Sequence, residues 1–529
     1  MLIGYVSDER YVALADVVLE FVNEDGSSWE TRSRATGSVH LDIPAGKYTV
    51  TLQKPGYGAK RSQVSVPLPA PHQFRLLSDG LSGYAWPKWV RSGESSEFRV
   101  HSVEPYQLEL WRYGWKPELV KSLGWHDEHG PRATMQVTPD GDYTQTGVKW
   151  NSVGYTNEAH KQYVEAPELS GLYYFRAQTA SGLKFSFPWI VAPRTPVAPL
   201  AVLGSNLTWN SYNSFGGRSN YINADKLPPT PTVNSRYDLV RYCDPRFLTW
   251  NWPSYAPLSF DRPEPFNHID FDTQITDPIH GRQACHLAPA EWRLLGWLEQ
   301  QGLAYDFYGE TQLDDETLDL QAYRALITAV HPEYWTRKMY DRVKKWVFED
   351  GGRLIYLGGN GLNCEVTLQG SAMVVHNGEI TGLDVDGVGG ESRLALRHES
   401  EASLLGVVFT PTGIMTGAPY KVVDNNHWAF DDTGLNNGDL FGTRSLHMRC
   451  PGGASGHETD KISASSPANS RLLAKGLNPD DGGAEMVNFE TSNGGSVFSV
   501  GSISWVSSLP VDEHVAQITE NVIRRFIEE

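Results

Sequence analysis

Three polar segments of this 529-residue chain each follow a short apolar run that is typical of a buried strand. Their side chains include a phenol, a carboxylate, an imidazole and amides, which can bind a metal or transfer a proton. In an open parallel sheet, ligands bind beyond the carboxyl ends of the strands. We therefore expect the three segments to meet at one site. They are TWNSYNSFGG (208–217) after the run at 200–203, HPEYW (331–335) after 324–330, and GGNG (358–361) after 353–357.

The residues of these segments favour metal or acid–base chemistry over covalent catalysis. Asn360 occupies the tight turn at which a glutamine-amidotransferase-type core carries its nucleophilic cysteine, and Cys364 lies beyond that turn. The sequence has no G-x-S-x-G, no H-E-x-x-H and no Cys/His cluster with zinc spacing. What remains is Tyr212, His331 and Glu333. The hard oxygen donors of Tyr212 and Glu333 suit a ferric ion or a similar Lewis acid better than zinc.

Two of these residues also have a purely structural interpretation. Glu333 is placed to cap the helix expected after it, and Asn360 is a residue type that tolerates a left-handed turn. Both interpretations stay open on the sequence alone.

The segments between the apolar runs predict the elements that position these residues. Helical spacing is expected over 290–301, which ends at Gly302, and over 336–350, while 511–527 forms a closing amphipathic helix. Further strands are expected at 303–308, 486–490 and 496–500. Strands that alternate with helices predict a doubly wound α/β domain over 196–529, with insertions at 205–289 and 365–480.

The N-terminal part predicts two β modules. Residues 1–78 contain short strands and turns, and the run IPAGKYTVTLQKPGY resembles the transthyretin-like β-sandwich of carboxypeptidase-regulatory modules. Residues 79–195 alternate apolar and polar side chains and predict an immunoglobulin-like or jelly-roll sandwich, which ends in a proline-rich linker. The expected fold class is thus multidomain α+β.

Composition excludes several classes of protein. Hydrophobic residues make up 40% of the chain and charged residues 20%, which excludes a disordered protein. A net charge of −18 repels phosphate backbones and makes a nucleic-acid partner unexpected. No apolar stretch has the length of a membrane helix, no signal peptide is evident, and the four cysteines are widely spaced. We therefore expect a reduced, cytoplasmic setting and no membrane partner.

Four motifs together resemble the large (beta) subunit of N,N-dimethylformamidase. They are TWNSYNSFGG, LSFDRP, HPEYWTRKMYDRVKKWVFEDGGRLIYLGGNG and MVNFETSNGGSVFSVGSISW, and the resemblance covers roughly residues 200–510. It implies a class I glutamine-amidotransferase-like core and a mononuclear iron, expected as Fe(III), held by two tyrosines and one glutamate. Tyr212 and Glu333 match two of these ligands, His331 matches a second-shell or acid/base histidine, Asn360 a substrate-binding amide, and Glu490 the glutamate of the F-E-T segment.

The third metal ligand stays open between two residues of the aromatic loop, or neither of them. Tyr255 lies in WNWPSYAPLSFDRP at a suitable distance along the chain from the other ligands. Many relatives instead carry a tyrosine directly after D-R-P, where this chain has Glu264. Two phenolates match the family's iron site, which favours Tyr255.

The resemblance implies hydrolysis of a small amide or a related C–N bond by metal-activated water. His331 or Glu490 would transfer the proton, and Asn360 would orient the carbonyl. The expected partners are a small amide substrate and further copies of the chain in a homo-oligomer, with or without a separate small subunit. The competing hypothesis is a non-catalytic ligand- or carbohydrate-binding protein with a degenerate amidotransferase-like core.

Overall fold

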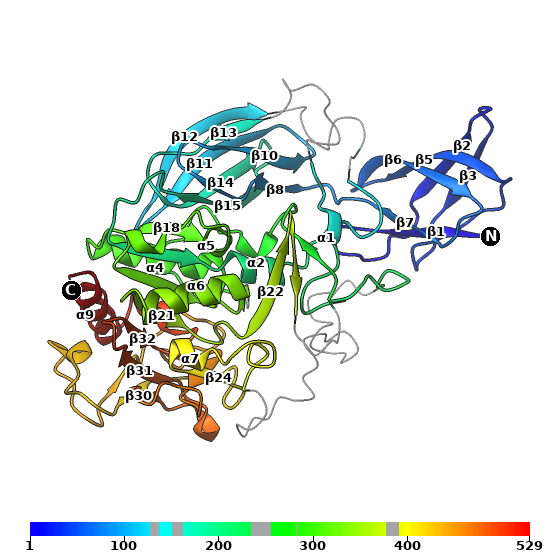
Figure 1. The fold of residues 1–529 in the computed structure, drawn as a ribbon. Coiled ribbons are helices and arrows are strands. Elements are labelled where there is room, and N and C mark those ends of the chain that lie inside the picture. The colour runs from blue at the N-terminus through cyan, green and yellow to red at the C-terminus, as the bar shows by residue number, and fades with distance from the viewer. Residues whose placement is uncertain are drawn as a thin grey trace.

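The computed structural model describes residues 1–126, 136, 138–150, 162–233, 255–281, 283–376 and 391–528. The chain forms two β modules followed by a larger domain built on a long mixed sheet (Figure 1). The N-terminal module lies at one end of the molecule, and the second β module covers one side of the larger domain. Within the described part of the chain, no helix combines the length and apolarity that crossing a membrane requires.

The N-terminal module is a small sandwich whose strands alternate buried and exposed residues. One sheet has the order β4-β1-β7 and the other the order β3-β2-β5-β6. Phe21, Val50 and Phe74 are among the residues that fill the space between them. The strands are β1 (Leu2–Ser7), β2 (Val18–Asn23), β3 (Ser28–Arg32), β4 (Ser38–His40), β5 (Gly46–Lys54), β6 (Gly58–Val66) and β7 (His72–Arg75).

The second module is also a two-sheet sandwich, with an aromatic core. Its sheets have the orders β13-β10-β8 and β12-β11-β14-β15-β9. Phe175, Phe187 and Trp189 pack against one another between the sheets. The strands are β8 (Leu81–Trp86), β9 (Trp89–Arg91), β10 (Ser95–Ser102), β11 (Tyr106–Tyr113), β12 (Pro117–His126), β13 (Tyr163–Glu165), β14 (Gly171–Thr179) and β15 (Lys184–Ala192).

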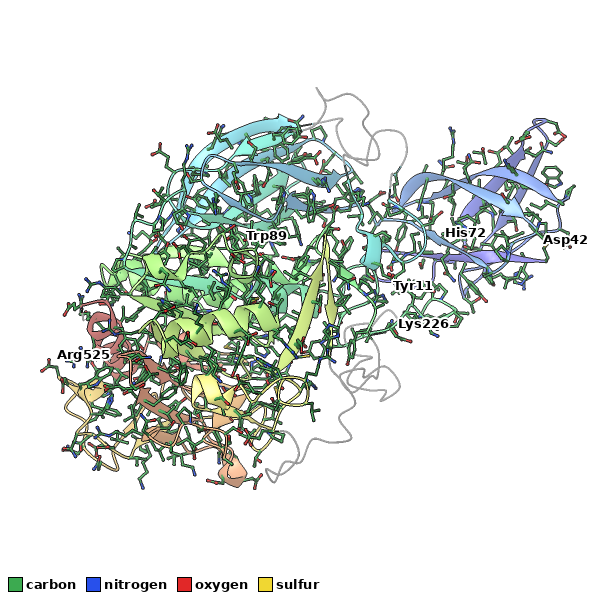
Figure 2. All side chains as sticks on the ribbon, viewed as in Figure 1. Tyr11, Asp42, His72, Trp89, Lys226 and Arg525 are labelled. Atoms are coloured by element: carbon green, nitrogen blue, oxygen red, sulfur yellow. The ribbon has the colours of Figure 1, made fainter. Side chains whose placement is uncertain are left out.

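Polar contacts fix the N-terminal module to the rest of the chain. Asp140 accepts hydrogen bonds from Ser62 (2.6 Å) and the Arg75 amide (3.0 Å) and forms an ion pair with the Lys60 ammonium. Burial alone would raise the pKa of Asp140, but the charge of Lys60 and the hydrogen bonds outweigh it and hold this pKa well below its usual range. Tyr11 lies on the side of the module that faces the other domains, whereas Asp42 lies at its far tip (Figure 2).

The larger domain is organised around a nine-stranded sheet. Its order is β18-β16-β19-β21-β32-β31-β30-β26-β27. The first five strands are parallel: β18 (Asp306–Gly309), β16 (Leu200–Gly204), β19 (Ala325–Val330), β21 (Arg353–Gly358) and β32 (Ser496–Ser499). The last four are antiparallel: β31 (Glu485–Glu490), β30 (Arg471–Gly476), β26 (Tyr420–Val422) and β27 (Leu440–Phe441).

The helices of this domain pack on the parallel half of the sheet. They are α2 (Asn206–Tyr212), α4 (Ala288–Gln300), α5 (Glu310–Asp314), α6 (Arg337–Phe348), α7 (Ala402–Leu405), α8 (Trp505–Ser508) and α9 (Glu513–Glu528). A four-stranded sheet of order β17-β23-β22-β20 borders the site: β17 (Leu258–Ser259), β20 (Tyr334–Trp335), β22 (Cys364–Gln369) and β23 (Ala372–Val375).

Most predicted elements of the α/β region are confirmed, and two expectations are corrected. Residues 208–217 were expected as a loop, but the segment begins inside the short helix α2. The sheet is parallel only in part, since strands from the expected insertion at 365–480 extend it on the antiparallel side. The likeness of this domain to a glutamine amidotransferase stays a prediction.

Candidate active site

The three polar segments do meet, as the sequence predicted. Tyr212 ends α2, which follows β16, while His331 and Glu333 follow β19 and Asn360 follows β21. The Tyr212 hydroxyl lies 3.2 Å from Glu333 Oε2, and His331 Nε2 lies 3.3 Å from the same oxygen. Asn360 Nδ2 lies 3.4 Å from His331 Nε2. Parallel strand order therefore brings four predicted residues to one sheet edge.

The backbone at two of these strand ends is strained in a way that turns the chain sharply. Val330, the last residue of β19, has φ +61°, which is costly for a β-branched residue. Asn360 has φ +52°, so its left-handed turn is confirmed, and its side chain also lies in the site. Glu333 does not cap the following helix, because Thr336 Oγ1 accepts the amide hydrogen of Met339 there (3.1 Å).

Glu333 is the centre of a buried cluster of oxygen atoms. Its side chain is 2% exposed. Oε2 accepts the Tyr221 hydroxyl at 2.8 Å in addition to that of Tyr212, and the Tyr221 hydroxyl also lies 2.7 Å from the hydroxyl of Tyr334. Oε1 lies 3.7 Å from the Arg393 guanidinium. Burial and the nearby Glu333 carboxylate raise the pKa of Tyr221 well above its usual value.

Tyr221 was missed by the sequence argument, and the two earlier candidates for the third ligand lie in different surroundings. Glu264 binds the Lys88 ammonium through Oε1 (2.6 Å) and accepts from Asn267 through Oε2 (3.0 Å). Tyr255 is half-buried and packs against the central core, and its role as a ligand stays a prediction. The residue after it hydrogen-bonds to Ala224 (3.0 Å), so Tyr255 lies on the chain segment beside Tyr221.

The D-R-P segment has a structural role that explains its residues. Arg262 is fully buried and donates to the carbonyls of Phe215 (2.7 Å) and Ser259 (2.9 Å). Asp261 accepts from Arg99 (2.6 Å) on the second β module. These bonds hold the loop after Tyr212 in place and join it to the preceding module.

Glu458 supplies the second carboxylate of the site. Its Oε2 lies 3.2 Å from His331 Nε2 and accepts from Asn360 Nδ2 (2.9 Å). Burial opposes a charge on His331, but its hydrogen bond to Glu458 and the charges of Glu458 and Glu333 outweigh burial and raise the pKa of His331. His331 therefore retains a proton more readily than an ordinary histidine.

The structure does not bring Glu490 to the other candidate residues. Glu490 ends β31, where its side chain is exposed and where it pairs with Ser496 at the start of β32. Because β31 runs antiparallel to the parallel half of the sheet, its carboxyl end lies at the edge opposite the site. Glu458 could be found in the sequence only as the polar G-H-E-T run, which carries no strand-end signal.

A second cluster of metal-binding residue types lies behind the site. Within the described residues, Cys285, His447 and His457 bring one ligand atom each within 4.8 Å of one another. The Cys450 amide donates to His447 Nδ1 (3.0 Å), so the neutral ring carries its proton on Nε2, which lies 2.9 Å from His457 Nδ1. These contacts describe a hydrogen-bonded imidazole pair, because a metal on His447 Nε2 would leave that ring without a proton.

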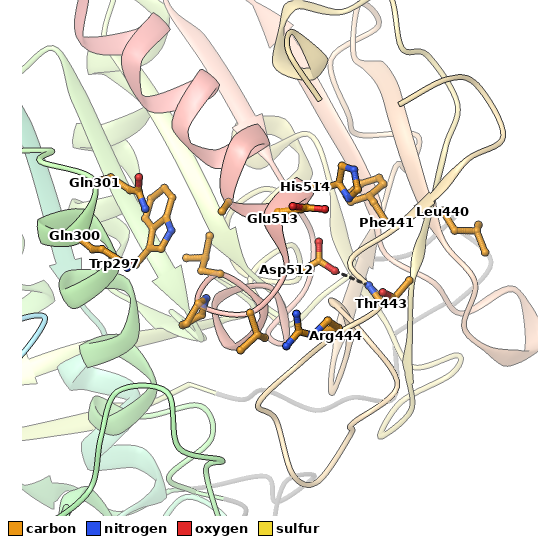
Figure 3. Close-up of a pocket in the computed structure, with 14 residues that line it drawn as sticks. Trp297, Gln300, Gln301, Leu440, Phe441, Thr443, Arg444, Asp512, Glu513 and His514 are labelled. Atoms are coloured by element: carbon orange, nitrogen blue, oxygen red, sulfur yellow. Dashed lines mark hydrogen bonds between the residues drawn. The ribbon is translucent and has the colours of Figure 1, made fainter. Parts of the chain in front are cut away.

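An open groove of about 570 Å³ lies apart from these residues (Figure 3). It is bounded by the start of α9, the end of α4 and the segment 440–444. Asp512 accepts the Thr443 amide hydrogen at 2.9 Å and fixes one wall. None of the predicted site residues lines it, so the groove does not belong to the candidate active site.

Comparison with known proteins assigns the chain to a family. Residues 107–519 match the family described as "N,N-dimethylformamidase beta subunit-like, C-terminal". The chain belongs to this family. The match includes Tyr212, Glu333, His331, Asn360 and Glu458, and it begins within the second β module.

Two curated relatives are N,N-dimethylformamidase beta subunits. The protein of Paracoccus aminophilus is 28% identical over 291 residues, which are 46% of this chain and 37% of the relative. The protein of Alcaligenes sp. is 28% identical over 401 residues, which are 64% of this chain and 50% of the relative. The chain thus spans half or less of the length of the relatives that it matches.

Solved structures add little. A segment of two fibronectin type III domains from chicken tenascin covers 33% of this chain and 83% of its own length, at 14% identity and a TM-score of 0.11. A likeness at this score carries no argument about the fold.

Proposed function

We propose that this chain hydrolyses a small amide or a related C–N bond with the help of a mononuclear ferric ion. One observation carries the proposal: two phenol oxygens, of Tyr212 and Tyr221, converge on one oxygen of the buried Glu333 carboxylate. Three hard, anionic or ionisable oxygen donors at one point are the donor set that a ferric ion prefers. The known relatives are named as subunits of an amide-cleaving enzyme, which supports the same reaction class.

The donor set fits the metal that the family implies. Glu333 would hold it together with Tyr212 and a second phenolate, for which Tyr221 is the nearest described candidate and Tyr255 the alternative. When bound, a ferric ion supplies Lewis acidity, which polarises a carbonyl and makes water more acidic. Arg393, whose guanidinium lies 3.7 Å from Glu333 Oε1, would fix the orientation of the carboxylate.

The remaining site residues are arranged to move the protons of hydrolysis. The Glu458 carboxylate accepts the proton of the water that attacks the amide carbon. His331, 3.2 Å from Glu458, delivers a proton to the amide nitrogen as the C–N bond breaks, which yields a carboxylic acid and an amine. Asn360 Nδ2 donates to Glu458 Oε2 at 2.9 Å and so fixes the position of this carboxylate beside His331.

Glu333→Gln tests this proposal. The substitution keeps the side-chain volume and removes the charge, so we expect loss of bound iron and loss of amide hydrolysis with the circular-dichroism spectrum retained. The substrates are small amides, beginning with N,N-dimethylformamide. A wild type that binds no iron and cleaves no amide would favour the competing hypothesis of a binding protein.

Glu310→Gln is the matched control. Glu310 is also fully buried, and burial raises its pKa well above the usual value, which favours the neutral form that a glutamine resembles. Its Oε1 accepts from the Trp335 indole at 2.8 Å, which a glutamine oxygen can replace. This variant should keep both iron and activity.

We also propose that the chain works with a partner chain. Both curated relatives are named beta subunits. Size-exclusion chromatography with light scattering on purified protein tests the assembly, and a strictly monomeric, fully active chain would contradict it.

A further inference from the structure

A cavity of about 460 Å³ lies where the two β modules meet the larger domain. Its walls come from the loop after β1, the connection between β7 and β8, strands β10 and β15, and the segments around Trp150, Phe215 and Pro265. The volume falls within the range of small-molecule sites. None of the residues that line it belongs to the candidate active site.

The walls are held rigidly before any ligand binds. Ser78 donates to Glu9 from its hydroxyl (2.6 Å) and from its amide (3.0 Å), which ties the β1–β2 loop to the β7–β8 connection. The Gly216 amide donates to the Glu9 carbonyl (2.7 Å) and brings Phe215 to the wall. Trp150 packs edge-on against the Phe215 ring, with 6.2 Å between centroids. These contacts therefore fix the shape of the cavity at the domain junction.

Three polar side chains that line this cavity lack a hydrogen-bond partner in the described structure. They are Ser82 through its hydroxyl, His101 through Nδ1 and Trp150 through its indole N–H. His101 is 3% exposed and Trp150 is fully buried. A buried polar group without a partner destabilises the folded state, so an occupant that bonds to all three would stabilise the junction.

The hydrogen-bonding character of these groups is fixed. Burial lowers the pKa of His101, so the ring is neutral, and its Nε2 donates to the Ser78 carbonyl at 3.1 Å. Nδ1 is then an acceptor, whereas the Trp150 indole is only a donor, and the Ser82 hydroxyl is both. A complementary ligand must present donors and acceptors side by side, as neighbouring hydroxyl groups do.

The charges near the cavity favour a neutral ligand. Both oxygens of Glu9 are bonded to Ser78, and Arg10, which is half exposed, pairs with Asp8 at 3.4 Å. The other walls include aromatic rings, which pack well against the C–H faces of a sugar ring. A charged ligand would find no unpaired opposite charge among the described lining residues.

We propose that this cavity binds a neutral mono- or disaccharide, with Ser82, His101 and Trp150 as its polar contacts and aromatic rings as its walls. The site is separate from amide hydrolysis and does not depend on the metal.

Titration calorimetry of the full chain with a panel of neutral sugars tests the proposal. The panel contains glucose, galactose, mannose, maltose, cellobiose and lactose, with gluconate as an acidic probe of similar size. We expect saturable binding of at least one neutral sugar and none of gluconate. Binding should persist in Glu333→Gln, so failure of the metal proposal and failure of this one are distinguishable.

Two variants locate the binding site. Trp150→Phe keeps a ring but removes the indole donor, and Ser82→Ala removes the hydroxyl. Each substitution should lower the affinity for the sugar about fivefold, which is the effect of one hydrogen bond. Trp125→Phe is the control, since Trp125 is 60% exposed and does not line the cavity. If no neutral sugar binds, or if both variants bind as tightly as wild type, the cavity holds only ordered water and the proposal fails.

Discussion

Replacing Tyr221 with phenylalanine removes one hydroxyl from the centre of the candidate site and leaves the ring in place. That hydroxyl lies 2.8 Å from Glu333 and 2.7 Å from the Tyr334 hydroxyl. If Tyr221 only orients Glu333, the loss of a hydrogen bond to a charged group costs about 1.5–3 kcal/mol, or roughly 10- to 150-fold in metal affinity. If Tyr221 is a ligand, iron is lost almost completely.

The two roles differ in colour as well as in affinity. A tyrosinate bound to Fe(III) gives a visible ligand-to-metal charge-transfer band, whereas a tyrosine that only donates to a ligand gives none. We expect Tyr221→Phe to lose iron, by elemental analysis after dialysis against a chelator, and to lose intensity in this band. Tyr255→Phe, measured in parallel, should keep most of both.

Tyr323→Phe is the matched control for this experiment. The Tyr323 hydroxyl also bonds to a buried carboxylate, that of Asp306 (2.9 Å), and to a second phenol, that of Tyr308 (2.7 Å), but it lies outside the site. The Tyr323→Phe variant should have a lower free energy of unfolding but should keep its bound iron. The reasoning is refuted if Tyr221→Phe keeps full iron and colour while Tyr255→Phe loses them, because Tyr255 would then be the second phenolate.

Four further substitutions test other parts of the structure. Glu458→Gln should lower amide hydrolysis by about 100-fold or more with iron retained, as expected for loss of a general base, whereas Glu490→Gln on the opposite sheet edge should have no effect on steady-state rates. Lys88→Met leaves the buried Glu264 carboxylate unpaired and should cost about 3–5 kcal/mol in urea unfolding; a cost under 1 kcal/mol would mean that the pair is unimportant. Asp140→Asn should destabilise the protein at pH 7. Because the pKa of Asp140 is depressed in the folded state, the difference in the free energy of unfolding between variant and wild type should persist above about pH 4 and shrink as the pH falls below it. A difference that grows on acidification would contradict this assignment.

The local sequence sufficed for the four residues at the strand ends. Apolar runs at 200–203, 324–330 and 353–357 predict buried parallel strands, and the polar residue directly after such a strand must lie at its carboxyl end. Glu333 and Asn360 were therefore expected at this edge, and Tyr212 was expected there too although it lies one short helix beyond its strand. The structure confirms that they meet, while their chemical roles stay predictions.

Tyr221 and Glu458 depended on tertiary contacts that no local pattern encodes. Tyr221 lies in an irregular segment that is held by the buried guanidinium of Arg262, whose partners are backbone carbonyls from distant parts of the chain. Glu458 bonds to Asn360, which lies 98 residues earlier in the chain. Loops of this kind take their shape from the surfaces around them, so their residues could not be placed from periodicity.

The separation of Glu490 from the other candidate residues has a simple physical cause. A buried strand has the same apolar pattern in either direction, so the run at 486–490 predicted a strand but not the edge at which it ends. The sequence by itself determined the strands, the helices and the residues that follow the parallel strands. Strand order and direction, the folding of the long loops and the approach of Tyr221 to Glu333 were decided only by tertiary packing, because they depend on contacts between segments far apart in the chain.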